Sequence, residues 1–510
     1  MDVAIMGSCR LGTLCWRGLP AALLFLVGGL PAVAQAPNGS GQQQFLENQI
    51  RPLIAPEFES PPTEDQLLIN HGAVLRSLTT WFEDHGNSLP FPQSSRALHI
   101  AEMRPWASLS YGAVHRGYIR GQLGYLTFND GDQFGPFGRE QDGQGPYVDL
   151  GYYEFDIDAA VKESGIGDAD DWAADFSIGR QYLYLGRGIT FGLTTEAVSL
   201  DWAYGNWAGL VFGSQSINRN VQFNGNPNSV AHQLDLRRFY GGQVEYQGWD
   251  RQELYSYVLG QFDNSLSTSN APVTYDSTYW GIGTTGEMLF GDPGQEWGVP
   301  NLRHHTEFIV QHGTNHHSFG SGSTPSVTDI SAWAIDTGLD YFWTVPGRPR
   351  VGVKYARASG DNTRIGGPQP NGGTNLPTTS DETFVGFGYM NTGASFAPQF
   401  SNLEFVNLSA AIRPFDDPDS PAWQNFEIGT SSYWYWRSDA DASISDARAN
   451  LRGDDYLGFE WDLFANWRLS SDLFLLINYG VFFPHEGSFS TFGDNDRSRQ
   501  FFTVNLNWLL

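Results

Sequence analysis

The sequence has almost no cysteine, because its two cysteines, Cys9 and Cys15, both lie near the start of the chain. That start has the parts of an export signal: two arginines, an apolar stretch at 21–30 and small residues up to Ala36. We therefore predict a signal peptide over residues 1–36. The chain that follows it contains no thiol, which excludes a disulfide framework and thiolate catalysis.

Long apolar runs are also missing. After residue 36 the sequence contains no run of about 18 apolar residues, the minimum for a helix that spans a bilayer, so we predict no transmembrane helix. Basic residues are scarce as well. The 29 Lys and Arg against 56 Asp and Glu give a net charge of -27, which argues against nucleic acid as a partner.

The chain instead contains segments of about 10–14 residues in which apolar and polar side chains alternate, separated by turns rich in Gly, Asn, Asp, Pro and Ser. In 456–468, for example, Trp461 and Leu463 share one face of an expected strand, and Glu460 and Asp462 share the other. Lipid on one side and a watery lumen on the other produce this pattern in membrane β-barrels.

About eighteen such segments extend from about residue 67 to residue 508. Charged side chains lie on one face of them, which the core of a soluble β-sandwich would not tolerate unpaired. We therefore predict an all-β protein: a transmembrane antiparallel β-barrel of about 18 strands over residues 66–510, located in the outer membrane of a Gram-negative cell. Residues 37–65, rich in Gln, Pro, Gly and Glu, are predicted to form a flexible periplasmic lead-in.

The sequence indicates neither catalysis nor a metal site. It contains no Gly-x-Ser-x-Gly elbow, and no pair of carboxylates stands out, so we predict no enzyme activity, no catalytic residue and no cofactor. Histidines do crowd the hairpin at 304–317. Because His304 and His305 are adjacent in an expected strand, they point to opposite faces, which favours no metal site there without deciding the question.

Several short motifs resemble, in the same order, those of the alginate export family. They are RPWA at 104–107, GRQ at 179–181, EAVSLDW at 196–202, GVKYARASG at 352–360, FSNL at 400–403, YWR at 435–437 and GVFFP at 480–484. The resemblance implies a monomeric barrel of 18 strands whose lumen carries arginines that guide a polyuronate outward. An arginine can bind a carboxylate through two parallel hydrogen bonds, and rings of basic side chains are a known means of selectivity in pores.

We predict that seven residues line the pore and bind substrate, either because they share the polar face of their strand or because they belong to these motifs. They are Arg104, Arg116, Arg120, Arg180, Asp201, Lys354 and Arg437. Arg180 presents a conflict, because it shares its parity with the apolar Ile178. Only a bulge, for example at Gly179, would turn it inward. Arg357 presents the same conflict with Val353. The commonest alternative for any one of these basic residues is an ion pair with a nearby acid in the lumen.

We therefore predict an outer-membrane channel that exports or passes an anionic polysaccharide, such as an alginate-like polyuronate, or a related anionic solute. The alternative is a general or sugar-specific porin, because acids are plentiful on the polar faces and Tyr153 stands where the family has an arginine. Expected partners are outer-membrane lipid, the solute and, from the resemblance, periplasmic export components. The sequence leaves open whether the glycine-rich loop at 361–381 plugs the lumen or hangs outside as a lid.

Overall fold

The computed structural model describes residues 66–83, 95–128, 141–165, 171–216, 237–249, 251–264, 274–290, 297–317, 326–365, 374–376, 379–415, 421–446, 454–485 and 498–510. The predicted signal peptide (1–36) and lead-in (37–65) lie outside these residues.

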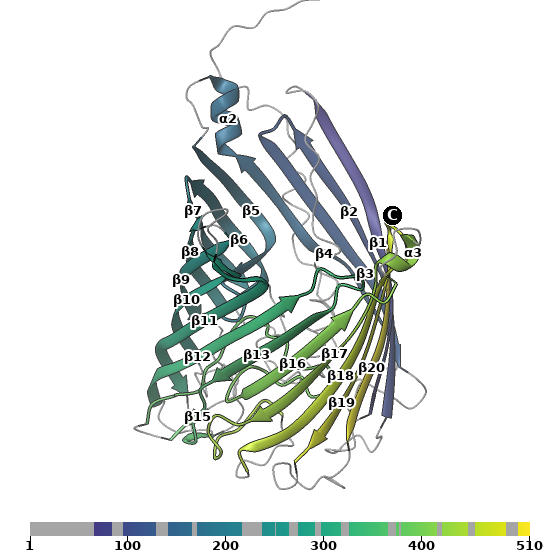
Figure 1. The fold of residues 1–510 in the computed structure, drawn as a ribbon. Helices are drawn as coiled ribbons and strands as arrows, with labels where there is room; N and C mark the ends of the chain where they lie inside the picture. The colour runs from purple at the N-terminus through teal and green to yellow at the C-terminus, as the bar shows by residue number, and fades with distance from the viewer. Residues whose placement is uncertain are drawn as a thin grey trace, which may run out of the picture. The chain divides into compact units, whose positions relative to one another are not determined.

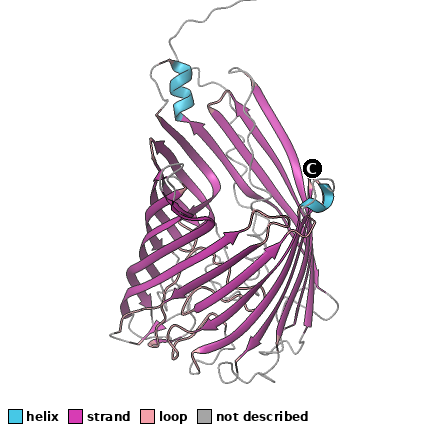
Figure 2. Ribbon diagram, in the orientation of Figure 1, coloured by secondary structure: helices cyan, strands magenta, loops and turns pink. Residues whose placement is uncertain are grey.

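Strands dominate the described part of the chain (Figure 2). The main sheet consists of β1 (Leu67–Glu83), β2 (Ser95–Tyr111), β3 (His115–Phe128), β4 (Gln141–Asp156), β5 (Trp172–Leu185), β6 (Phe191–Tyr204), β7 (Trp207–Ser216), β8 (Arg237–Trp249), β9 (Gln252–Asp263), β10 (Thr274–Phe290), β11 (Trp297–His317), β12 (Ser326–Phe342), β13 (Arg350–Ala358), β16 (Glu404–Ile412), β17 (Phe426–Trp436), β18 (Tyr456–Arg468), β19 (Leu473–Pro484) and β20 (Arg499–Leu509). Two short helices, α2 (Ile157–Ser164) and α3 (Pro421–Gln424), and a two-residue pair, β14 (Arg364–Ile365) with β15 (Thr374–Asn375), complete the elements.

The main sheet is a closed antiparallel barrel of 18 strands (Figure 1). Each strand pairs with the next one along the chain, and β20 pairs with β1. Closure leaves no strand edge without a partner, which a sheet needs where lipid surrounds it. The structure thus confirms the predicted fold. Among the described residues, no helix is long and apolar enough to cross a membrane.

The two faces of each strand differ as the alternation predicts. On β2, Arg104 and Ser108 are buried on the face that points into the barrel, whereas Met103 and Leu109 are exposed on the outer face. Exposed apolar side chains are the reverse of what a water-soluble protein shows. They fit a surface that lipid covers.

Connections at the two edges of the barrel differ in length. Short turns such as 112–114 and 205–206 lie at one edge, together with the C-terminus, whereas long connections such as 359–403 lie at the other. Short turns are periplasmic and long loops extracellular in barrels of this kind, so β1 starts at the periplasmic edge. Helix α2 also lies there, begun by the Asp156 carboxylate, which accepts a hydrogen bond from the Ala159 N–H at 2.8 Å.

A charge placed in the middle of the outer face should destabilise the barrel. Leu463 is an exposed apolar residue near the centre of β18. We expect Leu463→Arg to lower the free energy of unfolding by about 2–4 kcal/mol, because the guanidinium would lie in hydrocarbon. Equilibrium unfolding by urea in phosphatidylcholine vesicles measures this, with Leu463→Phe as the apolar control. Equal stability of the two variants would show that this face does not contact lipid.

Candidate functional site

The segment 359–403, which joins β13 to β16, folds into the lumen. Its two ends lie side by side: the Asn402 N–H donates to the Ser359 carbonyl at 3.2 Å, and the Ala358 N–H donates to the Leu403 carbonyl at 2.8 Å. Between them the chain reaches strands on several sides of the barrel. Of the loop at 361–381, the described residues contact the inner face of β11 and β12 near the extracellular ends of these strands.

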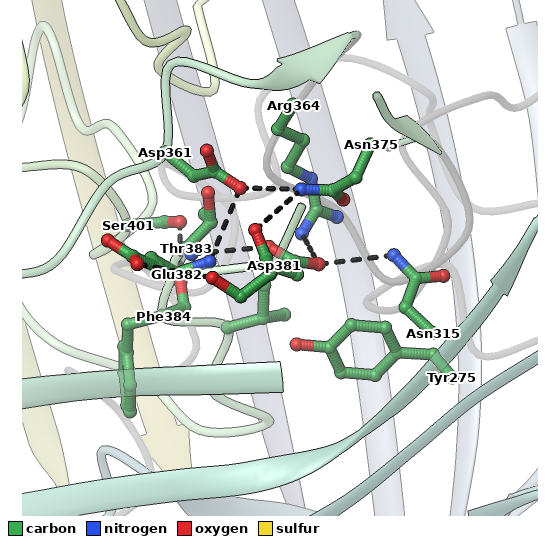
Figure 3. Close-up of polar contacts among 12 residues, drawn as sticks. Tyr275, Asn315, Asp361, Arg364, Asn375, Asp381, Glu382, Thr383, Phe384 and Ser401 are labelled. Carbon is green, nitrogen blue, oxygen red and sulfur yellow. Dashed lines mark hydrogen bonds and ion pairs between the residues drawn. The ribbon is translucent and has the colours of Figure 1, made fainter. Parts of the chain in front are cut away.

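A buried polar network holds the first part of this segment (Figure 3). Arg364 and Asp381 form an ion pair at 2.6 Å, with side chains that are 1% and 0% exposed. The Asn315 amide of β11 donates to the same Asp381 carboxylate at 3.1 Å. Burial lowers the pKa of Arg364, but Asp381, Tyr275 and Asp361 together with the hydrogen bond to Asp381 have the larger combined effect, so the pKa is raised. We call this network of Arg364, Asp381 and Asn315 the latch.

Backbone hydrogen bonds extend the latch to β12. The Ser331 N–H donates to the Asp381 carbonyl at 2.9 Å, and the Asp381 N–H donates to the Asp329 carbonyl at 2.7 Å. Within the segment, the Asp361 carboxylate accepts from the Asn375 amide at 2.5 Å. The latch thus joins the segment to the wall of the barrel at two adjacent strands.

The second part, residues 382–403, crosses the lumen, and we call it the crossing segment. Near its start, the Tyr279 hydroxyl of β10 donates to the Val385 carbonyl at 2.6 Å. Farther along, the Glu460 carboxylate of β18 accepts from the N–H groups of Ser395 at 2.7 Å and Phe396 at 2.8 Å. Because β10 and β18 are far apart around the sheet, this contact pattern spans the lumen.

Aromatic side chains fill the space around the crossing segment. Its buried members are Phe384, Phe387, Phe396 and Phe400, which pack against inward aromatic residues of the strands. Phe396 stacks on Phe482 of β19 with ring centroids 4.2 Å apart, and Phe387 meets Phe239 of β8 edge to face at 5.4 Å. The crossing segment is thus a packed obstruction of the described lumen.

The hairpin between β5 and β6 also folds inward and carries a cation that sequence reasoning missed. The Arg187 Nε lies 2.8 Å from a carboxylate oxygen of Asp336, and the Lys354 Nζ lies 3.3 Å from the other. His305 lies 3.6 Å from the same carboxylate. The predicted residue Lys354 therefore faces the lumen with one shared acid as its partner.

The predicted arginines Arg104, Arg116 and Arg120 lie together on the lumen face of β2 and β3. Arg104 pairs with Glu102 at 2.5 Å, and Arg120 pairs with Asp149 of β4 at 2.6 Å. Asp149 also lies 3.7 Å from Arg104, so it links the two arginines. We call Arg104, Arg116, Arg120 and their acids the arginine patch.

Acids outnumber arginines toward the periplasmic end of the patch. Arg116 pairs with Glu154 at 2.5 Å and Asp156 at 2.8 Å, and lies 3.9 Å from Asp175. Asp201 of β6 lies directly opposite Asp175 in the register. The structure therefore places the predicted residue Asp201 beside the patch, where it adds negative charge.

Arg437 lies just beyond the extracellular end of β17 and is buried. Its guanidinium donates to the Ala440 carbonyl at 3.1 Å. Burial lowers the pKa of Arg437, and Asp455 and Asp441 oppose that effect. Arg437 lies at the far end of the barrel from Arg116 and is no part of the arginine patch.

Arg180 does not face the lumen. Its pairing with β4 and β6 is regular through Gly179, so no bulge turns it inward. Arg180 shares the outward face with Ile178, which is 47% exposed, and pairs there with Glu196 at 2.5 Å. The expectation that it lines the pore is corrected: the strand parity, and not the motif, determines its side.

The histidine hairpin shows ordinary polar contacts. The His304 ring lies 2.7 Å from the Gln252 side-chain oxygen, and His305 lies beside Asp336. Among the described residues, no group of three or more potential metal ligands occurs.

Comparison with known proteins connects the chain to a family. Residues 190–500 match a family model described as "Alginate export". Among solved structures, the chain resembles Pseudomonas aeruginosa OccK9 (OpdG), at 10% identity, 87% and 98% coverage of the two chains and a TM-score of 0.49. It also resembles Acinetobacter baumannii OccAB1, at 10% identity, 89% and 99% coverage and a TM-score of 0.48. No curated protein matches the chain.

Proposed function

The chain belongs to the alginate export family, and from this premise we propose that it exports an anionic polysaccharide of the polyuronate class across the outer membrane. The family and the fold are those of an outer-membrane channel and not of an enzyme family. The arginine patch on the lumen face of β2 and β3 supports the substrate class. Lys354 and Arg437 are further proposed lining residues on the same route.

The pairing in the patch suits a polymer that must move. A uronate carboxylate has the same chemistry as the Asp149 and Glu102 carboxylates that now hold Arg120 and Arg104. One carboxylate can therefore replace another at each guanidinium with a small change in free energy. Sites of this kind bind weakly and exchange readily, as conduction through a pore requires.

A general porin is the second candidate, and the acids around Arg116 favour it. Glu154, Asp156 and Asp175 surround that single arginine, so the field there opposes the entry of an anion. The exporter and the general porin differ in which solute blocks the channel.

Periplasmic export components and a monomeric state remain expectations from the family.

Block of ion current by a defined oligouronate tests the proposal. We expect the oligouronate to block the parent channel in planar bilayers at low salt. The Arg104→Ala/Arg120→Ala variant should need an about 100-fold higher oligouronate concentration for the same block, because it loses two charge-assisted hydrogen bonds of about 1.5 kcal/mol each. A neutral maltooligosaccharide of equal length should block both channels weakly.

Removal of the acids provides the matched control. The Glu102→Gln/Asp149→Asn variant removes the negative charges that pair with the same two arginines, so the oligouronate should block it at lower concentration than the parent. Equal block by neutral and charged oligosaccharides, unchanged in both variants, would identify a general porin. The arginines would then serve as structural ion pairs.

A further inference from the structure

The two edges of the outer face differ in their arginines. Exposed outward aromatic side chains lie at both edges: Tyr204, Trp207, Trp249, Trp343 and Trp508 at the periplasmic edge, and Tyr184, Tyr240, Phe262 and Phe483 at the extracellular edge. Among strand residues whose side chains are described, the outward-facing arginines are Arg180, Arg238 and Arg357, all in the extracellular half. Arg238 is the second residue of β8, and Arg357 is the last but one of β13, so both lie at the extracellular edge.

This asymmetry matches two leaflets of different chemistry. Aromatic belts occur at both interfaces of a membrane protein, so the arginines and not the aromatic residues distinguish the two edges. A charge costs about 2–4 kcal/mol at the bilayer midplane and about 0–1 kcal/mol near the interface, so outward arginines belong at headgroup depth. Their confinement to one edge indicates that the headgroups on that side supply anions.

Arg357 is held loosely in a setting that suits a lipid phosphate. Its guanidinium lies over the outward Trp333 ring at 5.7 Å. Two of its polar contacts are long, 3.4 Å to the Glu404 carboxylate and 3.4 Å to the Ser438 carbonyl, and it also forms a hydrogen bond with the Tyr355 side chain. Contacts of this length are at the limit of a hydrogen bond, so a stronger acceptor at the surface can bind the guanidinium N–H groups of Arg357 in their place.

Arg238 provides a second outward cation. It is exposed, and it forms no ion pair with any residue that the structure describes. In the register it lies opposite Gln215, which lies opposite Glu196, the partner of Arg180. A row of outward polar side chains thus crosses the four adjacent strands β5 to β8. It lies on the extracellular side of the apolar Val211 and Val198, at the boundary of the hydrocarbon region.

We propose that Arg238 and Arg357 bind the phosphate groups of a phosphorylated glycolipid in the outer leaflet. The planar guanidinium matches phosphate geometry through two parallel hydrogen bonds. Trp333 gives the Arg357 site an aromatic platform at the same depth. The exposed Tyr240, two residues from Arg238, supplies a hydroxyl beside the other site. This proposal is independent of what passes through the lumen.

Binding of diphosphoryl lipid A to the folded barrel in detergent tests the proposal, with native mass spectrometry as the readout. Each basic residue near an anionic headgroup contributes about fivefold to affinity. We therefore expect Arg238→Gln/Arg357→Gln to bind lipid A about 25-fold more weakly than the parent does. The shift in mobility of unheated protein on a denaturing gel confirms that each variant is folded.

Arg348→Gln is the matched control, because Arg348 is an exposed arginine in the periplasmic turn between β12 and β13. It should bind lipid A as the parent does. A double variant that binds as tightly as the parent would overturn the proposal, and so would an equal loss in Arg348→Gln. If the parent bound phosphatidylglycerol as tightly as lipid A, the arginines would attract anionic lipid in general, and the proposal of glycolipid recognition would be wrong.

Discussion

Replacement of residues 385–400 by two glycines should raise single-channel conductance about tenfold, because an unobstructed barrel of 18 strands encloses an aqueous channel. The excised residues hold the aromatic side chains that pack across the lumen between β8 and β19. The ends to be joined already touch, since the Ser401 hydroxyl donates to the Phe384 carbonyl at 2.5 Å. No strand of the barrel loses a residue, so the sheet should still close. Recordings in planar bilayers give the conductance.

Insertion of the same two glycines between Gly205 and Asn206, in a periplasmic turn, is the control. It changes the length of a connection without touching the crossing segment, so conductance should equal that of the parent. An excision variant that conducts no better than the parent would show that the crossing segment does not limit ion flow. The parent channel would then conduct along another part of the lumen.

Asp381→Ala should release the latch. The substitution removes the carboxylate that faces the buried Arg364 guanidinium at 2.6 Å, and loss of one partner of a buried ion pair costs about 3–5 kcal/mol. The measurement uses a cysteine introduced at the buried Thr383, because the native cysteines lie within the predicted signal peptide. We expect Asp381→Ala to accelerate its labelling by a thiol reagent at least about 100-fold.

A charge-free version of the pair separates the ionic effect from packing. Arg364→Gln with Asp381→Asn keeps a donor facing an acceptor but buries no charge, so labelling of Thr383→Cys should stay slow. Replacement of the half-buried Ser380 by alanine provides a second control. If Asp381→Ala left the labelling rate unchanged, the backbone bonds to β12 would suffice to hold the segment.

Strand parity predicted the barrel well, because alternation is a local property of the sequence. In β18 the sides of Trp461 and Asp462 follow from a period of two and the presence of lipid on one side. The same reasoning predicted the outward side of Arg180, where a motif shared with relatives pointed inward. Helix α2 was not predicted, since eight residues carry too short a periodic signal.

The sequence by itself determined the fold class, the closed sheet and the face on which most charges lie. Only the tertiary structure decided what fills the lumen. Ser395 meets Glu460, and Phe387 pairs with Thr190, through contacts between residues far apart in the chain. No periodicity encodes such contacts. The partners of the arginines were equally hidden, because Asp149 reaches both Arg104 and Arg120 only after three strands pair in register. Pairing of distant charges depends on where the closed sheet brings them, and a local pattern cannot specify that.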